Sequence, residues 1–309
     1  MTRSARWACL VLGLWASAWE ATAAAQPRAA TLTHAVKKGD TLELLAAEYY
    51  GDRRDAIFIR VENGITRPRP LRPGERLRIP MDREITASAG DTLASLAKAH
   101  LGDERRAPLL AEVNKLSAGA SLAAGQTLRI PFFISHLVTA KDTLANLAAT
   151  YLGSSRRAEV LAAYNFVPNA ALTPGATIII PIYQVHLSDA RRPAPDPASR
   201  ARQENHAAMQ KRASERLPDA RAAWEAGNYA AAKKALTDLD IDYLDTAKAV
   251  DVAILLGSVE IAFGKPDEAL ALFRRALSRA PHHLLRAYQS SPKICAVWKQ
   301  AGGAIDRKR

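Results

Sequence analysis

The sequence predicts two halves of different fold class: an α+β N-terminal half of three tandem βααβ modules, and an all-α C-terminal half of helical repeats. Three observations support this prediction. A set of residues recurs twice at a spacing of 51 positions in the first half, alanine fills many apolar positions, and aromatic residues make up only 6% of the chain. Few aromatics and many alanines favour small helical units over a large sandwich or barrel.

Residues 1–25 have the layout of a secretory signal peptide. Arg3 and Arg6 precede the apolar stretch 7–19, and three alanines at 23–25 supply a cleavage site. We therefore expect export to the periplasm or cell wall; an uncleaved anchor is the alternative. Removal of this segment would reduce the formal net charge from +12 to +11. In an exported protein, such a charge favours anionic wall polymers or lipid head groups as neighbours.

The repeat consists of an Asp-Thr-Leu triplet, a glycine, an asparagine and a closing phrase that ends in Ile-Pro, always in this order. The triplets begin at Asp40, Asp91 and Asp142. Three copies in one register predict three domains of the same fold. Their expected boundaries are 34–82, 84–133 and 135–183.

Each copy is expected to fold as strand, helix, helix, strand. The opening segments alternate like half-buried strands; they are residues 34–37, 85–88 and 136–139. The triplet aspartate is expected to cap the first helix, with Glu43 completing a capping box in copy one alone. A glycine ends this helix because a left-handed residue is best tolerated there as glycine. The asparagine would close the second helix, and the final proline would mark the end of the closing strand. Short linkers are expected at 81–83 and 132–135.

Together these motifs resemble the lysin motif (LysM) family over roughly residues 34–183. Copy one carries nearly the full pattern, while copy two has Ala124 in place of a proline and copy three has Lys141 in place of a glycine. The resemblance implies two helices on one side of a two-stranded antiparallel sheet. It also implies binding of glycans that contain N-acetylglucosamine, peptidoglycan above all.

The family's shallow groove lies between the loop before the first helix and the loop after the second. By resemblance, copy one would use Gly39, Asp40, Thr41, Leu42, Ile65 and Thr66; copy two Gly90, Asp91, Thr92, Leu93, Leu116 and Ser117; and copy three Asp142, Thr143, Leu144, Phe166 and Val167. Backbone groups would bind the N-acetyl group while apolar side chains pack on the sugar. The same Asp and Thr would also occur as plain helix-start residues. Lys141 weakens the third site, because glycine lets a ligand approach the backbone.

Residues 184–197 contain alternating prolines, which favour a stiff, extended spacer at a domain boundary. The segment 198–304 then reads as a helical domain. Asp196 and Pro197 supply a cap and a first-turn proline for a long helix, and Pro218 is expected to break or kink this helix.

Seven residues of the helical domain resemble the tetratricopeptide repeat (TPR) pattern: Leu256, Gly257, Gly264, Ala269, Phe273, Ala276 and Pro281. The better copy would span 250–283, a degenerate copy 213–246, and a capping helix 292–302. The resemblance implies a concave face that recruits a protein partner. A purely structural helical domain is the alternative.

We expect no enzyme activity, cofactor or metal site. Cys295 lies on an apolar pattern with no histidine after it, which argues against a thiol nucleophile. His282 and His283 would point apart on a helix. The acidic residues at 238, 240, 242 and 245 are expected on a solvated loop, because glycoside cleavage needs paired carboxylates in a deep cleft. Neither a glycine-rich phosphate loop nor a serine elbow occurs.

Two functions from different classes remain. One is an exported adaptor whose lysin motifs hold peptidoglycan or a related N-acetylglucosamine polymer while the helical repeats recruit a protein. The other is an assembly protein whose lysin-like copies contact proteins and bind no sugar. Nucleic acid is not an expected partner, because basic residues do not interleave with aromatic ones.

Overall fold

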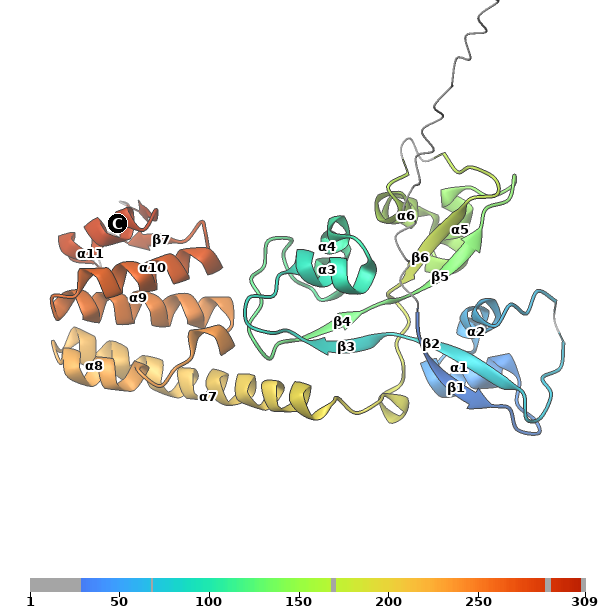
Figure 1. The fold of residues 1–309 in the computed structure, drawn as a ribbon, viewed down its shortest axis with the longest axis horizontal. Helices are drawn as coiled ribbons and strands as arrows, with labels where there is room; N and C mark the ends of the chain where they lie inside the picture. Colours follow the sequence, from blue (N-terminus) through green and yellow to red (C-terminus); the bar gives the residue numbers. More distant parts are fainter. Residues whose placement is uncertain (1–28, 68, 168–170, 287–289, 307–309) are drawn as a thin grey trace, which may run out of the picture.

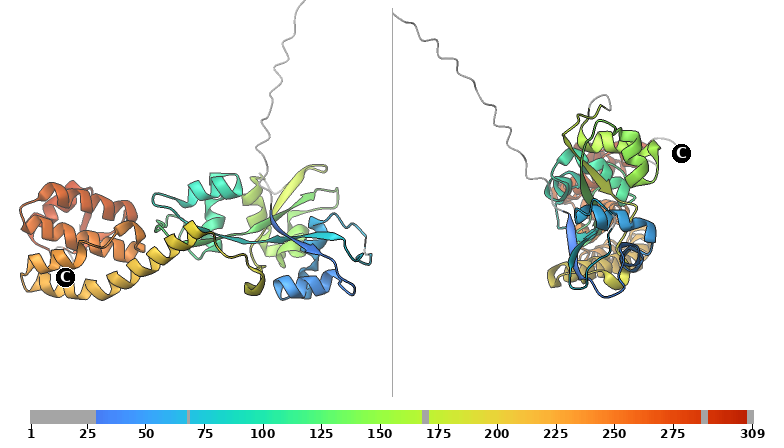
Figure 2. Two further views of the ribbon diagram at one scale, coloured as in Figure 1. Left: turned by 60° about the horizontal axis from the view of Figure 1, so that its bottom comes forward. Right: turned by 90° about the vertical axis from the view of Figure 1, so that its right-hand side faces the viewer.

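The computed structural model describes residues 29–67, 69–167, 171–286 and 290–306. The expected signal peptide lies outside this part of the chain. Figure 1 shows three small α/β units at one end, a stack of helices at the other, and the long helix α7 (Pro197–Glu225) between them. Figure 2 shows the same elongated arrangement from a second side (left) and along the long axis of the molecule (right). Within the described residues, no helix combines the length and the apolar character that a membrane crossing requires.

Each unit has the predicted order of strand, helix, helix, strand. Unit one contains β1 (Ala30–Ala35), α1 (Leu42–Tyr50), α2 (Ala56–Glu62) and β2 (Arg76–Met81). Unit two contains β3 (Arg83–Thr86), α3 (Leu93–Leu101), α4 (Ala107–Val113) and β4 (Thr127–Ile130). Unit three contains β5 (Phe132–Leu137), α5 (Leu144–Leu152), α6 (Ala158–Asn165) and β6 (Thr177–Ile182). A short 3-10 helix joins the two helices of each unit: η1 (Arg53–Asp55), η2 (Glu104–Arg106) and η3 (Ser155–Arg157).

The strands are longer than predicted, and they absorb the expected linkers. In unit one the antiparallel pairing runs from Ala30 opposite Met81 to Ala35 opposite Arg76. A single residue, Asp82, separates β2 from β3, and Pro131 separates β4 from β5. The linker prediction was wrong because the apolar alternation continues through both segments. The prolines near the strand ends are tolerated because each strand of a two-stranded sheet has a free edge.

The residue that caps each first helix is the threonine of the triplet, which corrects the prediction of an aspartate cap. Thr41, Thr92 and Thr143 each accept a hydrogen bond from the backbone amide three residues later. In units two and three, the side chains of Ser95 and Asn146 accept a hydrogen bond from the backbone amide of the capping threonine. Capping boxes therefore occur in units two and three, where none was predicted, since serine and asparagine can replace the glutamate of the usual pattern.

The helix ends follow the predicted residues. Gly51, Gly102 and Gly153 end the first helices with φ of 84°, 84° and 74°, in the left-handed region. The asparagine does more than end the second helix. Asn63 donates to the carbonyls of Ile59 and Arg78, both at 2.7 Å, and accepts from the Arg78 amide at 2.8 Å. Asn114 and Asn165 repeat this pattern. The asparagine thus fixes each second helix to the closing strand.

The three units share their apolar cores. Phe58 of unit one packs edge-to-face on Phe132 of unit three, with ring centroids 5.7 Å apart, and both side chains are buried. Val113 of unit two lies in a second shared cluster with Tyr164 and Ile179 of unit three. A unit of about 50 residues buries a smaller fraction of its surface on its own than a large domain does. Sharing the cores compensates for this, so the units form one assembly.

The segment 184–197 packs against the units, which corrects the prediction of an extended spacer. Leu187 is buried in the core of unit one, and the Ser188 amide donates to the Tyr49 carbonyl at 2.8 Å. Gln184 donates to the Tyr151 carbonyl at 2.7 Å. The prolines begin only after these contacts, so the composition of residues 191–197 did not represent the whole segment.

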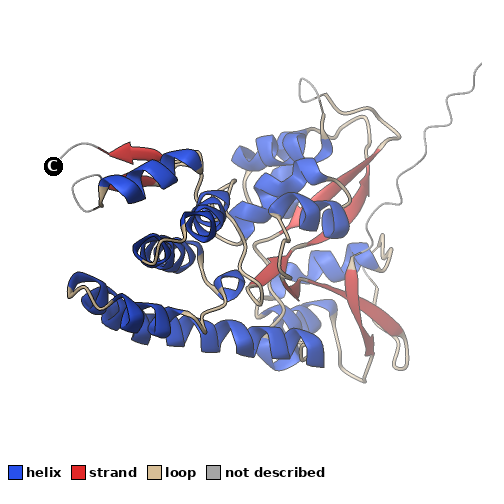
Figure 3. Ribbon diagram, turned by 60° about the vertical axis from the view of Figure 1, so that its left-hand side comes forward, coloured by secondary structure: helices blue, strands red, loops and turns tan. Residues whose placement is uncertain are grey.

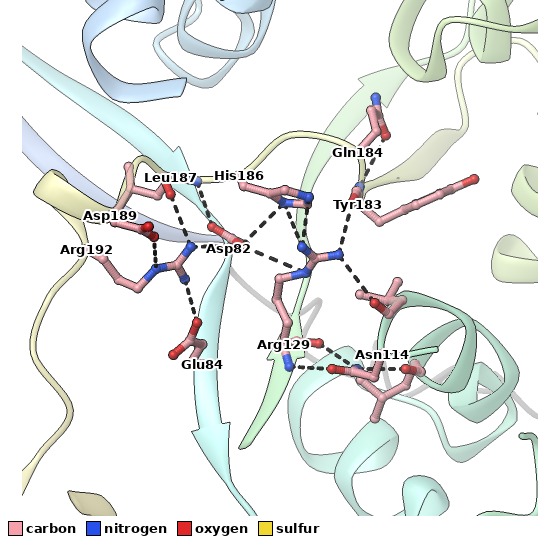
Figure 4. A network of polar contacts seen from close by, with 12 residues as sticks. Asp82, Glu84, Asn114, Arg129, Tyr183, Gln184, His186, Leu187, Asp189 and Arg192 are labelled. Atoms are coloured by element: carbon pink, nitrogen blue, oxygen red, sulfur yellow. Dashed lines mark hydrogen bonds and ion pairs between the residues drawn. The ribbon is translucent and has the colours of Figure 1, made fainter. Parts of the chain in front are cut away.

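Asp82 lies at the centre of a polar network between unit one, unit two and this segment (Figure 4). Its side chain is 1% exposed, and its carboxylate lies within 4.0 Å of Arg129, His186 and Arg192. It also accepts the Leu187 amide at 2.9 Å. Burial and the neighbouring Arg129 hold the pKa of His186 below its usual value. A buried carboxylate requires such cationic partners, so the network fixes the joint.

The C-terminal half is mostly helical, as predicted (Figure 3). After α7 come α8 (Tyr229–Leu236), η6 (Ile241–Tyr243), α9 (Thr246–Ala262), α10 (Pro266–Arg279) and α11 (Pro292–Gln300). The parallel pair β7 (Leu284–Arg286) and β8 (Ala304–Asp306) completes it. Asp196 caps α7 as predicted, by accepting from the amides of Ala198 and Ser199.

Pro218 was expected to break or kink the long helix, and the structure shows no break: α7 continues through it. Pro218 is exposed, while its neighbours Leu217 and Ala220 are buried in the helical core. On the exposed face, water can bind the carbonyl that a proline leaves without a helical donor. Packing of the buried face therefore preserves the helix.

Candidate functional site

The loop before α1 is held by a buried side-chain relay. The Asp40 carboxylate lies 2.9 Å from Nε2 of His34, and Nδ1 of His34 lies 3.0 Å from the Tyr49 hydroxyl. Because a carboxylate only accepts, Nε2–H donates to Asp40 and Nδ1 accepts from Tyr49. Asp40 also accepts the Lys37 amide at 2.7 Å. The hydrogen bond from His34 is the main reason that the pKa of Asp40 lies below its usual value.

Unit three repeats this relay with His136, Asp142 and Tyr151. Nε2 of His136 lies 3.0 Å from Asp142, and Nδ1 lies 3.1 Å from the Tyr151 hydroxyl. This hydrogen bond from His136, with two from Thr139, lowers the pKa of Asp142 to about 2. Unit two has Ile85 in place of the histidine. The relay was not predicted from the sequence, although the matching histidine and tyrosine positions in copies one and three could have indicated it.

The triplet aspartates therefore hold the turn before the first helix. Asp91 does so in unit two by accepting the Ser88 amide at 2.8 Å. The aspartates and the threonines have structural roles in all three units. A ligand in these loops would meet mainly backbone groups and the neighbouring apolar side chains.

Unit one has a cavity of about 630 Å³ at the predicted groove. One wall consists of Gly39, Asp40, Thr41, Leu42 and Glu43, so the structure brings the first part of the predicted site together. The other wall consists of Ala56, Ile57, Arg60, Arg69, Pro70 and Leu71. The predicted Ile65 is instead buried in the core of unit one, and Thr66 lies outside the described lining.

Residues 69–71 take the predicted place of Ile65 and Thr66. Arg69 is held beside the groove by an ion pair with Glu75. This wall was not predicted because the loop between Asn63 and β2 is long. The spacing of the motif residues did not show which part of that loop faces α1. The apolar pair Pro70 and Leu71 was the available signal.

Unit two has a cavity of about 510 Å³ at the equivalent place. Gly90, Asp91, Thr92 and Leu93 line it as predicted, with Ala94 and Ala107 beside them. The opposite wall consists of residues 118–122, followed by Asp242, Ser278 and Arg279 of the helical domain. The predicted Leu116 packs against the core of unit two, and Ser117 lies outside the described lining.

The site residues predicted in unit three were one position out of register. Phe166 has φ of 55°, which matches Gly64 at 62° and Lys115 at 56°. Phe166 is therefore the counterpart of Gly64, and Val167 is the counterpart of Ile65. The counterpart of Thr66 is residue 168, which lies outside the described residues.

Two further features distinguish unit three. Gly39 and Gly90 have positive φ, but Lys141 at the equivalent position of unit three does not: among the described non-glycine residues, positive φ occurs at Lys115 and Phe166. Lys141 therefore closes its turn without a left-handed backbone. The guanidinium of Arg105, from unit two, lies 3.7 Å from the centre of the Phe166 ring. This cation–π contact occupies one face of a ring that had been assigned to the third sugar site, and the Phe166 residue is 36% exposed.

Two proteins of Mycobacterium tuberculosis, Esterase Rv1288 (strain ATCC 25618 / H37Rv) and Esterase MT1326 (strain CDC 1551 / Oshkosh), are each 33% identical to this chain over 148 residues. The match covers 48% of this chain and 32% of each relative. The chain thus spans about a third of their length. Because both relatives are named esterases, this similarity contradicts the prediction that the chain has no enzyme activity. That prediction had rested on the absence of catalytic motifs in this sequence.

The LysM domain family matches residues 34–80 and 85–131. These segments correspond to units one and two, which also contain the two cavities. The chain therefore carries two LysM domain segments, each with a groove in front of its first helix.

Proposed function

We propose that the chain binds a glycan containing N-acetylglucosamine, such as peptidoglycan, in the grooves of units one and two. The observation that carries this proposal is the cavity of about 630 Å³ in unit one. Gly39 has φ of 95°, and among the described atoms none lies within 4 Å of the place where its Cβ would be. Open backbone beside Leu42, Ile57 and Leu71 provides polar groups for an N-acetyl group and an apolar face for a sugar ring.

The third unit is proposed to be a LysM copy with a mainly structural role. It has the same βααβ order and the same asparagine contacts as the other two units. Its core is shared with both neighbours, and Arg105 occupies one face of the Phe166 ring. Two sites on one rigid assembly would bind a polymer of repeating sugars more strongly than one, through effective concentration.

The helical domain is proposed to be a TPR-like platform for a protein partner. A Cβ on Gly257 would clash with the ring of Phe273, and Ala269 and Ala276 are fully buried. Small residues at these positions let α9 and α10 pack closely, as the TPR resemblance requires. A cavity of about 660 Å³ between α7, α9 and β7, lined in part by Trp224 and Leu255, is the candidate partner surface.

Export to the cell envelope is part of the same proposal. It is supported by the layout of residues 1–25 and by the LysM segments, whose proposed ligand lies outside the cytoplasmic membrane. The high positive charge suits neighbours such as anionic wall polymers.

Sedimentation of the purified mature chain with insoluble peptidoglycan tests the proposed function. Glu43 and Ala94 are exposed residues at equivalent positions of α1 and α3, and each lines its groove. Glu43→Trp and Ala94→Trp should fill the grooves and reduce retention, most strongly in combination. Ala145→Trp is the matched control, because Ala145 is exposed at the same position of unit three.

Three outcomes would contradict sugar binding. Absence of retention at low salt would leave the LysM segments without a glycan and would favour a role in protein contacts. Retention that disappears at moderate salt would indicate binding by charge alone. Equal retention of the groove variants and the Ala145→Trp control would place the binding site elsewhere. Because Glu43→Trp makes the protein more positive, reduced retention of this variant could not result from weaker charge attraction.

A further inference from the structure

The second groove is built by two domains. Asp242, Ser278 and Arg279 of the helical domain complete the wall that residues 118–122 of unit two begin. The described lining of the first groove comes from unit one alone. With about 510 Å³ in the second groove and about 630 Å³ in the first, the helical domain lines the second groove without filling it.

A turn of unit two docks the helical domain at this place. The amide of Ala124 donates to the Asp242 carbonyl at 2.7 Å, and Ala124 is 2% exposed. Arg279 donates to the carbonyl of Leu122 at 2.8 Å and to that of Asp242 at 3.1 Å. The Ser121 hydroxyl donates to the Arg279 carbonyl at 3.1 Å. Four residues of the groove lining, Ser121, Leu122, Asp242 and Arg279, therefore also join the domains, and Ala124 adds a contact just outside the lining.

The equivalent turns of units one and three could not make these contacts. Pro73 and Pro174 occupy the position of Ala124, and proline has no amide hydrogen to donate. A Cβ on Gly125 would clash with the Arg202 carbonyl of α7. At the equivalent glycines of the other units, no described atom lies within 4 Å of that place. The departure of copy two from the LysM pattern thus coincides with the docking contact.

A second contact holds the sheet of unit two against α7. Nε2 of Gln203 on α7 donates to the hydroxyls of Thr86 on β3 and Thr127 on β4, at 3.0 and 3.1 Å. Figure 1 shows α7 running below this sheet. The docked position is therefore fixed by two sets of contacts, one from α7 and one from η6 and the end of α10.

We propose that the second groove is a composite glycan site, in which a bound N-acetylglucosamine oligomer contacts unit two and the helical domain together and stabilises their docking. This inference rests on the proposed function. Because a ligand that contacts both domains favours the docked state, docking must strengthen glycan binding by the same factor. Binding of wall glycan in the second groove would then stabilise the docked position of the helical domain, which is the domain proposed to recruit a protein.

Ala124→Pro in the mature full-length chain tests this inference. Proline is the residue of the other two copies at this turn, and the turn bond from Gln126 to Ala123 has equivalents in both of them. The substitution therefore suits the fold of unit two while it removes the bond to Asp242. Pro73→Ala is the matched control, since it exchanges the same residues at an equivalent turn without such a contact.

The measurement is hydrogen–deuterium exchange of the full chain with and without an N-acetylglucosamine hexamer, together with calorimetric titration. In the wild type, the hexamer should protect residues 39–43, 89–94 and also 240–244 and 275–280. In Ala124→Pro, protection of the helical segments should disappear and affinity at the second groove should fall by about fivefold or more. Protection at 39–43 should remain.

The outcomes separate the two proposals. Protection of 39–43 and 89–94 without any change in 240–244 or 275–280 would overturn the composite site and leave glycan binding intact. Equal affinity of the second groove in the wild type and in Ala124→Pro would do the same. No protection in either groove would overturn both proposals.

Discussion

Replacement of Asp82 tests how the units are joined. The variant Asp82→Ala removes a carboxylate that is 1% exposed and leaves Arg129, His186 and Arg192 without it. Loss of one partner from a buried ion pair costs roughly 3–5 kcal/mol. Arg192 keeps Glu84 at 3.2 Å, which favours the lower end of this range. We therefore expect the free energy of unfolding of the three-unit half to fall by about 3 kcal/mol.

The two halves can be monitored separately in urea. After removal of the first 25 residues, the tryptophans of the chain are Trp224 and Trp298, both in the helical domain. Tryptophan fluorescence therefore follows this domain, while circular dichroism follows both halves. Asp82→Ala should move the dichroism transition to lower urea and change the fluorescence transition less.

Glu84→Ala is the control for this experiment. It removes an acid from the same arginine, but the Glu84 side chain is 46% exposed, so a cost below about 1 kcal/mol is expected. Asp82→Asn keeps an acceptor for the Leu187 amide, so its loss of unfolding free energy should lie between those of Asp82→Ala and Glu84→Ala. The reasoning is refuted if Asp82→Ala and Glu84→Ala destabilise the protein equally.

Three further predictions follow from local contacts. Asn114→Ala removes two hydrogen bonds to Arg129 of β4 and one to the Leu110 carbonyl of α4 and should cost about 2–3 kcal/mol in urea unfolding followed by circular dichroism. Pro218→Ala restores a helical amide on the exposed face of α7 and should raise the urea midpoint of the tryptophan transition; a lower midpoint would show that the proline is needed. Because the folded pKa of Asp142 is lowered to about 2, the unfolded state binds more protons, so this carboxylate's contribution is complete above about pH 4 and is lost as the pH falls towards 2. Acid titration of the wild type and His136→Asn should show this, with a higher Asp142 pKa in the variant.

Much of the fold followed from the sequence because the repeat supplied each signal three times. The glycines at the ends of the first helices and the apolar faces of those helices lie where periodicity placed them. The cap was assigned one residue too early because aspartate and threonine are both good caps. The structure shows that the aspartates instead hold the preceding turn, by accepting the amides of Lys37, Ser88 and Thr139. The shared cores could not be predicted, because an apolar residue that packs against another unit, such as Phe58, has the same local sequence pattern as an apolar residue exposed on the surface.

The site was predicted on one wall only. The loop before the first helix is short and fixed by the triplet, so in units one and two its residues line a cavity where the LysM resemblance places the groove. The opposite wall lies in a loop whose path depends on tertiary contacts, such as the pairing of Arg69 with Glu75. In unit two this wall even includes Arg279, which lies more than 150 positions after Leu122 in the chain. Local spacing carries no information about such a partner.

The substitutions that weaken the family pattern are informative for this reason. Three copies of one fold should differ where their surroundings differ, because a position with the same role in every copy is held to the same residue type. Ala124 departs from the proline of the other two copies at the one turn where the described structure needs an amide donor, towards Asp242. Lys141 departs from glycine at a turn that needs no left-handed residue, and its carbonyl accepts a bond from Asn146 at 3.0 Å. The first departure thus marks a domain contact, and the second marks a loop with a geometry different from that of the two grooves.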